Sequence, residues 1–382
     1  MGLRQVKGLV CHRCGARAGE RSALCADCGP LGLLEYAYDY EEAARTLDRD
    51  SLGRRETWMW RYRELLPLDE LAETPNLQVG MTPVSGAPRL AAWLGLAGLW
   101  LKDEGRSPTG SIEDRASALC VAQARDSARK VVAVASDGAA APSCACFAAA
   151  TGLSAVVFAT ADACAADLSL ATLFGATILE VAGSKAAARE LCEKACHELK
   201  WFDGTALASA FPFEAKKTAG HEIAEQLEVK MPDWVAVADD EGETVASVAR
   251  GLEEMRTLKL ARQAPRLLRV VRSRSGKEPA FQRAEKLVQQ SEGETVTVAA
   301  DGAAAALLQA ARQAALLVDE DGARAIAGLR RAVEDGVIQP SQTALALVGG
   351  RRREAAAPAK RTRVGNELAR VERAMTRPGQ AG

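Results

Sequence analysis

Four cysteines near the start of the chain have the residue type and the spacing of a metal site. They occur as two Cys-x-x-Cys-Gly pairs, at Cys11 and Cys14 and at Cys25 and Cys28. Each pair can turn two thiolates toward one ion, because the glycine accepts the turn geometry, and two pairs complete a tetrahedral sulfur shell. We therefore predict a structural zinc ion in a zinc-ribbon-like segment over residues 1–35. This segment has too small an apolar core to fold without a metal cross-link. A ribbon with reduced, metal-free cysteines is the alternative.

A second group of possible ligands lies further along the chain. Cys192, Cys196 and His197 fall in a stretch with helical character, and the two cysteines are one turn apart. A second metal site is one interpretation of this group. We favour the other interpretation, in which the cysteines are small buried thiols.

Residues 100–115 read as an apolar strand, a Pro/Gly turn and the start of a helix. Their Ser-Pro-Thr-Gly-Ser-Ile-Glu-Asp-Arg resembles the Asn-Pro-Thr-Gly-Ser-Phe-Lys-Asp-Arg of threonine synthases, which are pyridoxal phosphate (PLP) enzymes. The likeness continues at residues 60–67, 217–227 and 232–237, and similar cysteine pairs open some members of that family. In the family, the lysine of this turn holds the cofactor as a Schiff base. Here its position is taken by Glu113.

The resemblance implies an α/β fold of the fold type II PLP class, like tryptophan synthase β, with two doubly wound three-layer domains. We expect the large domain over 36–115 and 205–350 and the small α/β domain over 116–204. A basic tail is expected over 351–382. Independently, short β-rich runs separated by helix-length segments indicate parallel βαβ units with both sheet faces covered.

The resemblance also implies which positions contacted the cofactor. The family's phosphate loop, Gly-Asn-Gly-Gly-Asn, aligns with residues 240–244, where only one glycine remains and three carboxylates replace neutral residues. The asparagine beside the ring oxygen aligns with Ala139, and the threonine at the pyridine nitrogen aligns with Val348. The degenerate cofactor positions are Ser111, Asp114, Ala139, Gly242, Thr244 and Val348.

These replacements predict that PLP is not bound. A carboxylate at position 113 cannot form an imine, and one acid about 4 Å from the phosphate costs about 1 to 4 kcal/mol. We expect a catalytically inactive pseudoenzyme that acts as a binding or assembly module. An amine, a basic peptide or a divalent cation would suit the remodelled cleft, or its acids merely solvate it. Those acids are Glu113, Asp137, Asp240, Glu241 and Glu243.

Two enzymatic alternatives stay open. The first is an active PLP-dependent lyase that converts O-phosphohomoserine to threonine with a lysine elsewhere. Lys102 is the nearest lysine in the sequence, but its family counterpart is structural. The second is an enzyme that uses Glu113 and Asp137 for acid/base or metal chemistry. His221 is expected on a helix surface and not as a general base.

The overall charge excludes some partners. The 382 residues contain 49 basic and 50 acidic side chains, a net charge of −1, so we expect neither nucleic acid nor an acidic membrane as a partner. No run approaches the roughly 18 to 20 apolar residues of a membrane span. With no apolar leader before Cys11, we expect a cytoplasmic protein with reduced thiols. The family resemblance suggests a homodimer.

The C-terminal segment 351–382 differs in composition from the rest. It has nine basic and three acidic residues, which predicts a solvated tail or a docking arm for an acidic protein partner. Leu368, Val371 and Met375 can share one apolar face of a short helix capped by Asn366.

Overall fold

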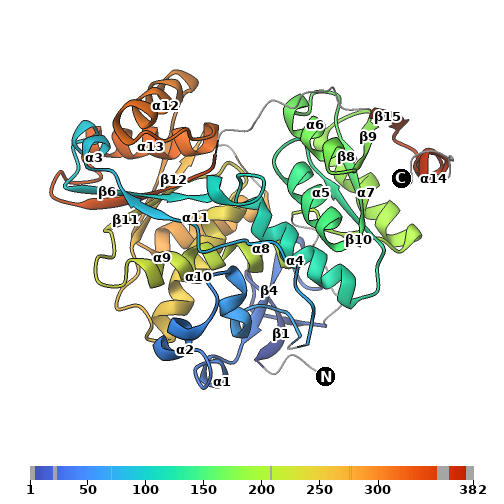
Figure 1. The fold of residues 1–382 in the computed structure, drawn as a ribbon, viewed down its shortest axis with the longest axis horizontal. Coiled ribbons are helices and arrows are strands. Elements are labelled where there is room, and N and C mark those ends of the chain that lie inside the picture. Colours follow the sequence, from blue (N-terminus) through green and yellow to red (C-terminus); the bar gives the residue numbers. More distant parts are fainter. Residues whose placement is uncertain are drawn as a thin grey trace.

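The computed structural model describes residues 5–19, 24–69, 71–206, 209–274, 276, 278–350 and 361–375. Three sheets organise this part of the chain, with four, six and five strands. Figure 1 shows the six-stranded unit on the left, the five-stranded unit on the right and the N-terminal strands below them. The predicted α/β class is confirmed, since helices cover both faces of each larger sheet.

The N-terminal sheet is antiparallel, in the order β2-β1-β4-β3. Its strands are β1 (Val6–Cys11), β2 (Arg17–Ala18), β3 (Leu24–Cys25) and β4 (Gly29–Tyr38). Only Leu9, Leu34 and two cysteines are buried in its own core. The segments that follow are α1 (Tyr40–Ala43), α2 (Arg49–Arg54) and η1 (Met59–Leu65). Their apolar side chains pack against the six-stranded unit, except that Met59 and Trp60 of η1 pack in the apolar cluster of the five-stranded unit.

The six-stranded sheet has the order β13-β12-β11-β14-β6-β5, and all of its pairings are parallel except that of the edge strand β5. Its strands are β5 (Val84–Gly86), β6 (Gly98–Asp103), β11 (Trp234–Ala238), β12 (Arg266–Val271), β13 (Glu294–Thr297) and β14 (Thr343–Val348). Its helices are α3 (Pro88–Leu94), α9 (Thr218–Gln226), α10 (Glu243–Thr257), α11 (Pro279–Gln290), α12 (Ala300–Ala314) and α13 (Glu320–Glu334). Because both faces are covered, β14 is apolar at nearly every position.

The five-stranded sheet is parallel throughout, in the order β10-β7-β8-β9-β15. Its strands are β7 (Val131–Ala135), β8 (Ser154–Ala159), β9 (Thr177–Val181), β10 (Phe202–Asp203) and β15 (Arg361–Gly365). Around it lie α4 (Glu113–Asp126), α5 (Ala140–Thr151), α6 (Ala165–Leu173), α7 (Lys185–Leu199) and the short α8 (Phe211–Lys216). Across the described ranges, we find no helix with the length and apolarity needed to cross a membrane.

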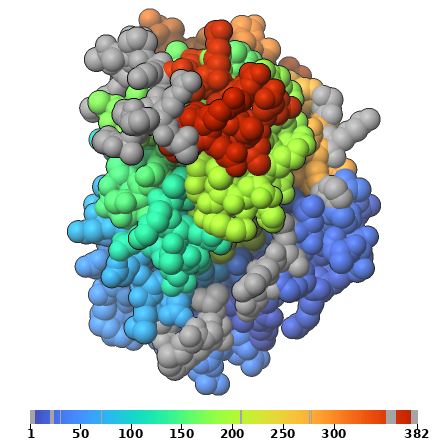
Figure 2. Space-filling model, turned by 90° about the vertical axis from the view of Figure 1, so that its right-hand side faces the viewer, coloured from blue at the N-terminus to red at the C-terminus, as the bar shows by residue number. Residues whose placement is uncertain are grey.

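The expectation of a solvated C-terminal tail is wrong for residues 361–375. β15 pairs with β9, and α14 (Leu368–Met375) buries Val371 against the apolar cluster of the small sheet. Figure 2 shows α14, in red, lying on this unit. The apolar face foreseen for the helix therefore covers a sheet edge of the same chain, while Arg361 and Arg363 pair with Glu180. Residues 351–360 and 376–382, with five of the nine basic positions, lie outside the described residues.

The expectation that His221 lies on a helix surface is also wrong. His221 is fully buried, and its Nε2 lies 2.7 Å from Glu254 Oε2. The cause is the close approach of α9 and α10 through Gly220 and Gly251. A Cβ on Gly251 would lie 2.0 Å from the carbonyl oxygen of Lys217, so only glycine permits this packing.

Candidate functional site

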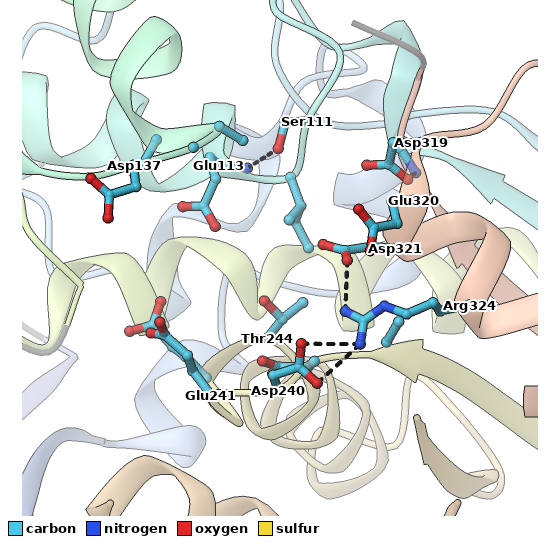
Figure 3. A pocket seen from close by; sticks show the side chains of 18 of the residues that line it. Ser111, Glu113, Asp137, Asp240, Glu241, Thr244, Asp319, Glu320, Asp321 and Arg324 are labelled. Atoms are coloured by element: carbon cyan, nitrogen blue, oxygen red, sulfur yellow. Dashed lines mark hydrogen bonds and ion pairs between the residues drawn. The ribbon is translucent and has the colours of Figure 1, made fainter. Parts of the chain in front are cut away.

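A cleft of about 1250 Å³ lies between the two α/β units. The carboxyl ends of β7, β11 and β14 line it together with the first turns of α4, α10 and α13, which is the usual position of ligand sites in parallel sheets. Nine acidic and five basic residues line it, so its formal charge is −4. The acids are Glu113, Asp137, Asp239, Asp240, Glu241, Glu243, Asp319, Glu320 and Asp321. Figure 3 shows Glu113 and Asp137 facing Asp240 and Glu241.

The structure brings together all five acids that the sequence suggested for an alternative ligand, Glu113, Asp137, Asp240, Glu241 and Glu243. Of the six degenerate cofactor positions, Ser111, Ala139 and Thr244 line the cleft, whereas Asp114, Gly242 and Val348 do not.

Each of those three residues has another role. Asp114 is fully buried and accepts hydrogen bonds from the backbone N–H and hydroxyl of Thr109, at 2.7 and 2.6 Å. Gly242 is the N-cap residue of α10, with a φ of 97°. Val348 packs in the apolar cluster beneath α13, and Leu347 lines the cleft instead, because side chains alternate along β14.

Glu113 is engaged by a lysine that the sequence analysis did not single out. Lys216 Nζ donates to Glu113 Oε1 at 2.7 Å and to Glu243 Oε1 at 2.9 Å. The lysine side chain is 3% exposed. Glu113 and Glu243 begin α4 and α10, where the helix dipole favours a carboxylate. The sequence did contain a signal for this partner. Glu113 stands where the resembling family has a lysine, and a carboxylate in a cleft is stabilised by a nearby cation.

The environment of Lys216 fixes its charge. Burial by itself would lower the pKa of Lys216, but the two carboxylates raise the pKa well above its ordinary value. At neutral pH the side chain is therefore an ammonium group whose nitrogen has no free electron pair. It cannot attack a carbonyl in this state.

Asp239, at the end of β11, is a second residue missed from the sequence. Its Oδ1 accepts the N–H of Gly242 at 2.8 Å, and its Oδ2 accepts the N–H of Val245 at 2.9 Å. Burial raises the pKa of Asp239, while these two amides oppose the rise. Amides at a helix start are the groups that bind phosphate in many proteins. Here the chain's own carboxylate already occupies two of them.

The outer acids of the cleft are paired with arginines. Asp240 accepts hydrogen bonds from Arg324 Nη1 at 3.0 Å and from Arg272 Nη1 at 2.7 Å. Burial would raise the pKa of Asp240, but these arginines lower it overall. Glu241 pairs with Arg189 of α7 at 3.0 Å, so one ion pair joins the two units across the cleft.

Lys102 lies outside the cleft lining. It is fully buried, and its Nζ donates to Glu222 Oε2 at 2.6 Å, to the carbonyl oxygen of Thr82 at 2.7 Å and to Gln226 Oε1 at 2.9 Å. Arg115 joins the same network through Glu222. These contacts assign Lys102 to the internal ion pairs of the six-stranded unit.

The four N-terminal cysteines converge on one point. Their sulfur atoms all lie within 4.8 Å of one another, and Cys14 Sγ is 3.6 Å from Cys25 Sγ. Tetrahedral coordination with metal–sulfur bonds of about 2.3 Å places sulfurs about 3.8 Å apart. The backbone N–H groups of Arg13 and Ala16 donate to Cys11 and Cys14. Cys11, Cys14, Cys25 and Cys28 could therefore hold one metal ion, outside the cleft lining.

Comparison with known proteins agrees with this fold. Residues 76–350 match the family model described as pyridoxal-phosphate dependent enzyme. The chain is 28% identical to the threonine synthase of Methanosarcina acetivorans, covering 90% of this chain and 91% of the relative. It is also 28% identical to the threonine synthase of Methanocaldococcus jannaschii, over 89% and 91%.

Solved structures share the fold at lower identity. An ACC deaminase homologue has a TM-score of 0.62 and 17% identity, covering 78% of this chain and 95% of that chain. Maize serine racemase has a TM-score of 0.60 and 16% identity, covering 77% and 91%.

Proposed function

The chain belongs to the pyridoxal-phosphate dependent enzyme family, and from this premise we propose that it is a threonine synthase-like pseudoenzyme that acts as a binding or assembly module. One observation carries the proposal. The ammonium group of Lys216 is held between Glu113, at the position of the family's catalytic lysine, and Glu243, in the former phosphate loop.

The cleft residues do not fit PLP. An imine requires an unprotonated amine, and the position expected to supply it holds a carboxylate. The phosphate would meet Asp239 at the helix start, where it caps two amides. One such contact at about 4 Å costs about 1 kcal/mol in water and about 4 at an effective dielectric of 20. We therefore derive no chemical step through this cofactor.

A cationic ligand suits the cleft better than an anionic one. The lining carries an excess of four carboxylates over cations. We propose an amine, a basic peptide or a divalent cation as the ligand class, with Glu113, Asp137, Asp240, Glu241 and Glu243 as the contacts. The carboxylate-enzyme alternative has less support. Its two acids, Glu113 and Asp137, already accept hydrogen bonds from Lys216 and from the N–H of Thr160.

The active PLP lyase remains the second candidate, and one observation favours it. Lys216 Nζ lies 2.7 Å from the carboxylate at the family's lysine position, so Lys216 is the lysine that such an enzyme would use. The protonation of Lys216 and the capped amides oppose this reading.

The visible absorption spectrum of the purified chain with added PLP separates the two candidates. We expect no internal-aldimine band and no phosphate release from O-phosphohomoserine. A band that disappears in Lys216→Ala but persists in Lys185→Ala, a matched change of an exposed lysine in the same cleft, would overturn the pseudoenzyme proposal in favour of the lyase.

The other expectations are proposals as well. We propose a structural zinc at the four N-terminal cysteines, supported by their convergence. We propose a homodimer on the family resemblance, and a protein partner for the basic C-terminal segment on its charge. Since Arg361 and Arg363 already pair with Glu180, that partner would meet the other cations of the segment.

A further inference from the structure

A second cluster of possible metal ligands lies in the five-stranded unit, outside the cleft. Cys192 and Cys196 of α7 and Asp203 of β10 place their ligand atoms within 4.8 Å of one another. Cys192 Sγ is 4.0 Å from Asp203 Oδ1. None of the three lines the cleft.

This cluster differs from the group suggested by the sequence. His197 is 77% exposed in its side chain and contacts Glu198, because it follows Cys196 directly and so points about 100° away around the helix. Asp203, from the strand after the helix, takes the third place. The sequence could not show this, since it depends on how α7 packs against β10.

The spacing of the two cysteines suits chelation. Residues four apart on a helix lie above one another on the same face, as in helical zinc motifs with two ligands at i and i+4. Both cysteines are buried, at 0% and 7% exposure. Asp203 is half-buried, which leaves an approach for an ion from solvent.

Thr205 orients two of the three ligands. Its backbone N–H donates to Asp203 Oδ1 at 2.8 Å. Its Oγ1 accepts the N–H of Ala135 at 3.0 Å and forms a hydrogen bond with Cys192 Sγ at 3.6 Å. Hydrogen bonds of this kind hold metal ligands in position.

The charge of the cluster also calls for a cation. Among the described residues, no lysine, arginine or histidine forms an ion pair with Asp203, although most other acids of the core have such a partner. A half-buried carboxylate beside two polarisable thiols is stabilised by a positive ion.

We propose that Cys192, Cys196 and Asp203 bind a thiophilic divalent cation of the zinc type, with water in the fourth position. Two sulfurs select such an ion over magnesium or calcium. Metal–sulfur and metal–oxygen bonds of about 2.3 and 2.1 Å place sulfur and oxygen about 3.6 Å apart, so Cys192 Sγ and Asp203 Oδ1, now 4.0 Å apart, need to approach each other slightly. Each thiol releases its proton to solvent as its metal–sulfur bond forms.

The test counts cadmium ions bound to the full-length, reduced chain. After chelation, loading with Cd²⁺ and desalting, we expect two cadmium ions per chain and thiolate-to-cadmium charge-transfer absorption. Cys192→Ser should retain only the ion at the four N-terminal cysteines. The double variant Cys14→Ser, Cys28→Ser should retain only the ion at Cys192, Cys196 and Asp203. Cys146→Ser is the matched control, because Cys146 is buried on α5 outside the cluster, and it should retain two.

Asp203→Asn gives a second measurement that leaves both thiols and the core volume unchanged. It should weaken cadmium binding at this site at least tenfold, whether or not Cys192→Ser folds. The proposal is overturned if the variant lacking both Cys14 and Cys28 thiols binds no cadmium, or if Asp203→Asn binds it as tightly as the unaltered chain.

Discussion

Lys216 separates two carboxylates that would otherwise face each other in the cleft. The ammonium contacts Glu113 and Glu243, and both acids gain further stabilisation from the starts of their helices. This arrangement leaves neither Glu113 nor Glu243 without a cation. It also ties the starts of α4 and α10 to the end of α8.

We predict that Lys216→Met destabilises the chain by about 3 kcal/mol, because it leaves two partly buried acids without their cation. Adding Glu113→Gln should recover part of this loss, since the remaining repulsion disappears. Urea unfolding of the single and double variants measures both effects. Lys185→Met, at an exposed lysine of the same cleft, should change stability by less than about 0.5 kcal/mol. Equal losses at the two lysines would contradict a stabilising role for the ion pairs of Lys216 with Glu113 and Glu243.

The raised pKa of Asp114 predicts a pH dependence of stability opposite in sign to that of an acid whose pKa is lowered by folding. Burial raises the pKa of Asp114 from 3.8 to about 6. Because the folded chain then binds the proton more tightly than the unfolded chain, the stabilisation is present below pH 3.8 and is lost as the pH rises to about 6. Two pKa units correspond to about 3 kcal/mol.

Asp114→Asn, which stays neutral, should lack this dependence. Urea midpoints measured between pH 4 and 7 should therefore show the unaltered chain losing stability relative to the variant as the pH rises through about 6. The difference between the two curves removes the contribution of other acids, such as Glu254, whose pKa is lowered to about 2. Parallel curves would show that Asp114 titrates normally.

Helices and strands were predictable where the sequence pattern is local. The apolar runs of β11 and β14 identify strands covered on both faces. The burial of His221 was not predictable in this way, because it depends on α10, a helix distant in sequence, approaching α9 through Gly220 and Gly251. The pairing of β15 with β9 was missed for the same reason, since its basic residues read as solvated until Glu180 is placed beside them.

We predict that Gly251→Ala destabilises the chain by about 1 to 3 kcal/mol through overpacking. The added Cβ would lie 2.0 Å from the backbone oxygen of Lys217, so α9 and α10 must separate and weaken the contact between His221 and Glu254. Thermal unfolding measures the loss. Gly302→Ala is the matched control, because its nearest neighbour, Val298 Cγ1, is 3.5 Å away. That change should be neutral or stabilising by up to about 1 kcal/mol.

The cleft as a whole was foreseen only in part. The resemblance placed five acids in one cleft, and the structure brings all five together. Lys216 and Asp239, which decide what those acids can do, come from the end of a short helix and from the residue before the aligned loop. Their roles depend on the relative placement of α4, α8 and α10, which no single segment encodes.

The N-terminal sheet depends on both its cysteines and the rest of the molecule. Its own core is small, but Glu35 of β4 pairs with Arg250 and Arg283, and Tyr38 donates to Glu214 at 2.8 Å. These contacts hold β4 on α8 and on α10 and α11 of the six-stranded unit, whereas the cysteine pairs lie at the turns. Loss of a metal should therefore loosen the turns before it affects the α/β units.

We predict that Cys14→Ser removes one zinc ion, that chelation removes the zinc of both proposed sites, and that either change makes residues 1–35 sensitive to protease. Far-ultraviolet circular dichroism should remain nearly unchanged, because the α/β units contain nearly all of the helix. Zinc content and the mass of the cleavage products measure the two effects, and Cys164→Ser, at an exposed cysteine on another unit, should cause neither.

If the chelated chain stayed resistant at its N-terminus, the strand contacts of β4 would suffice to fold this segment. If chelation instead unfolded the whole chain in one transition, the metal would stabilise the entire molecule through Glu35 and its two arginines.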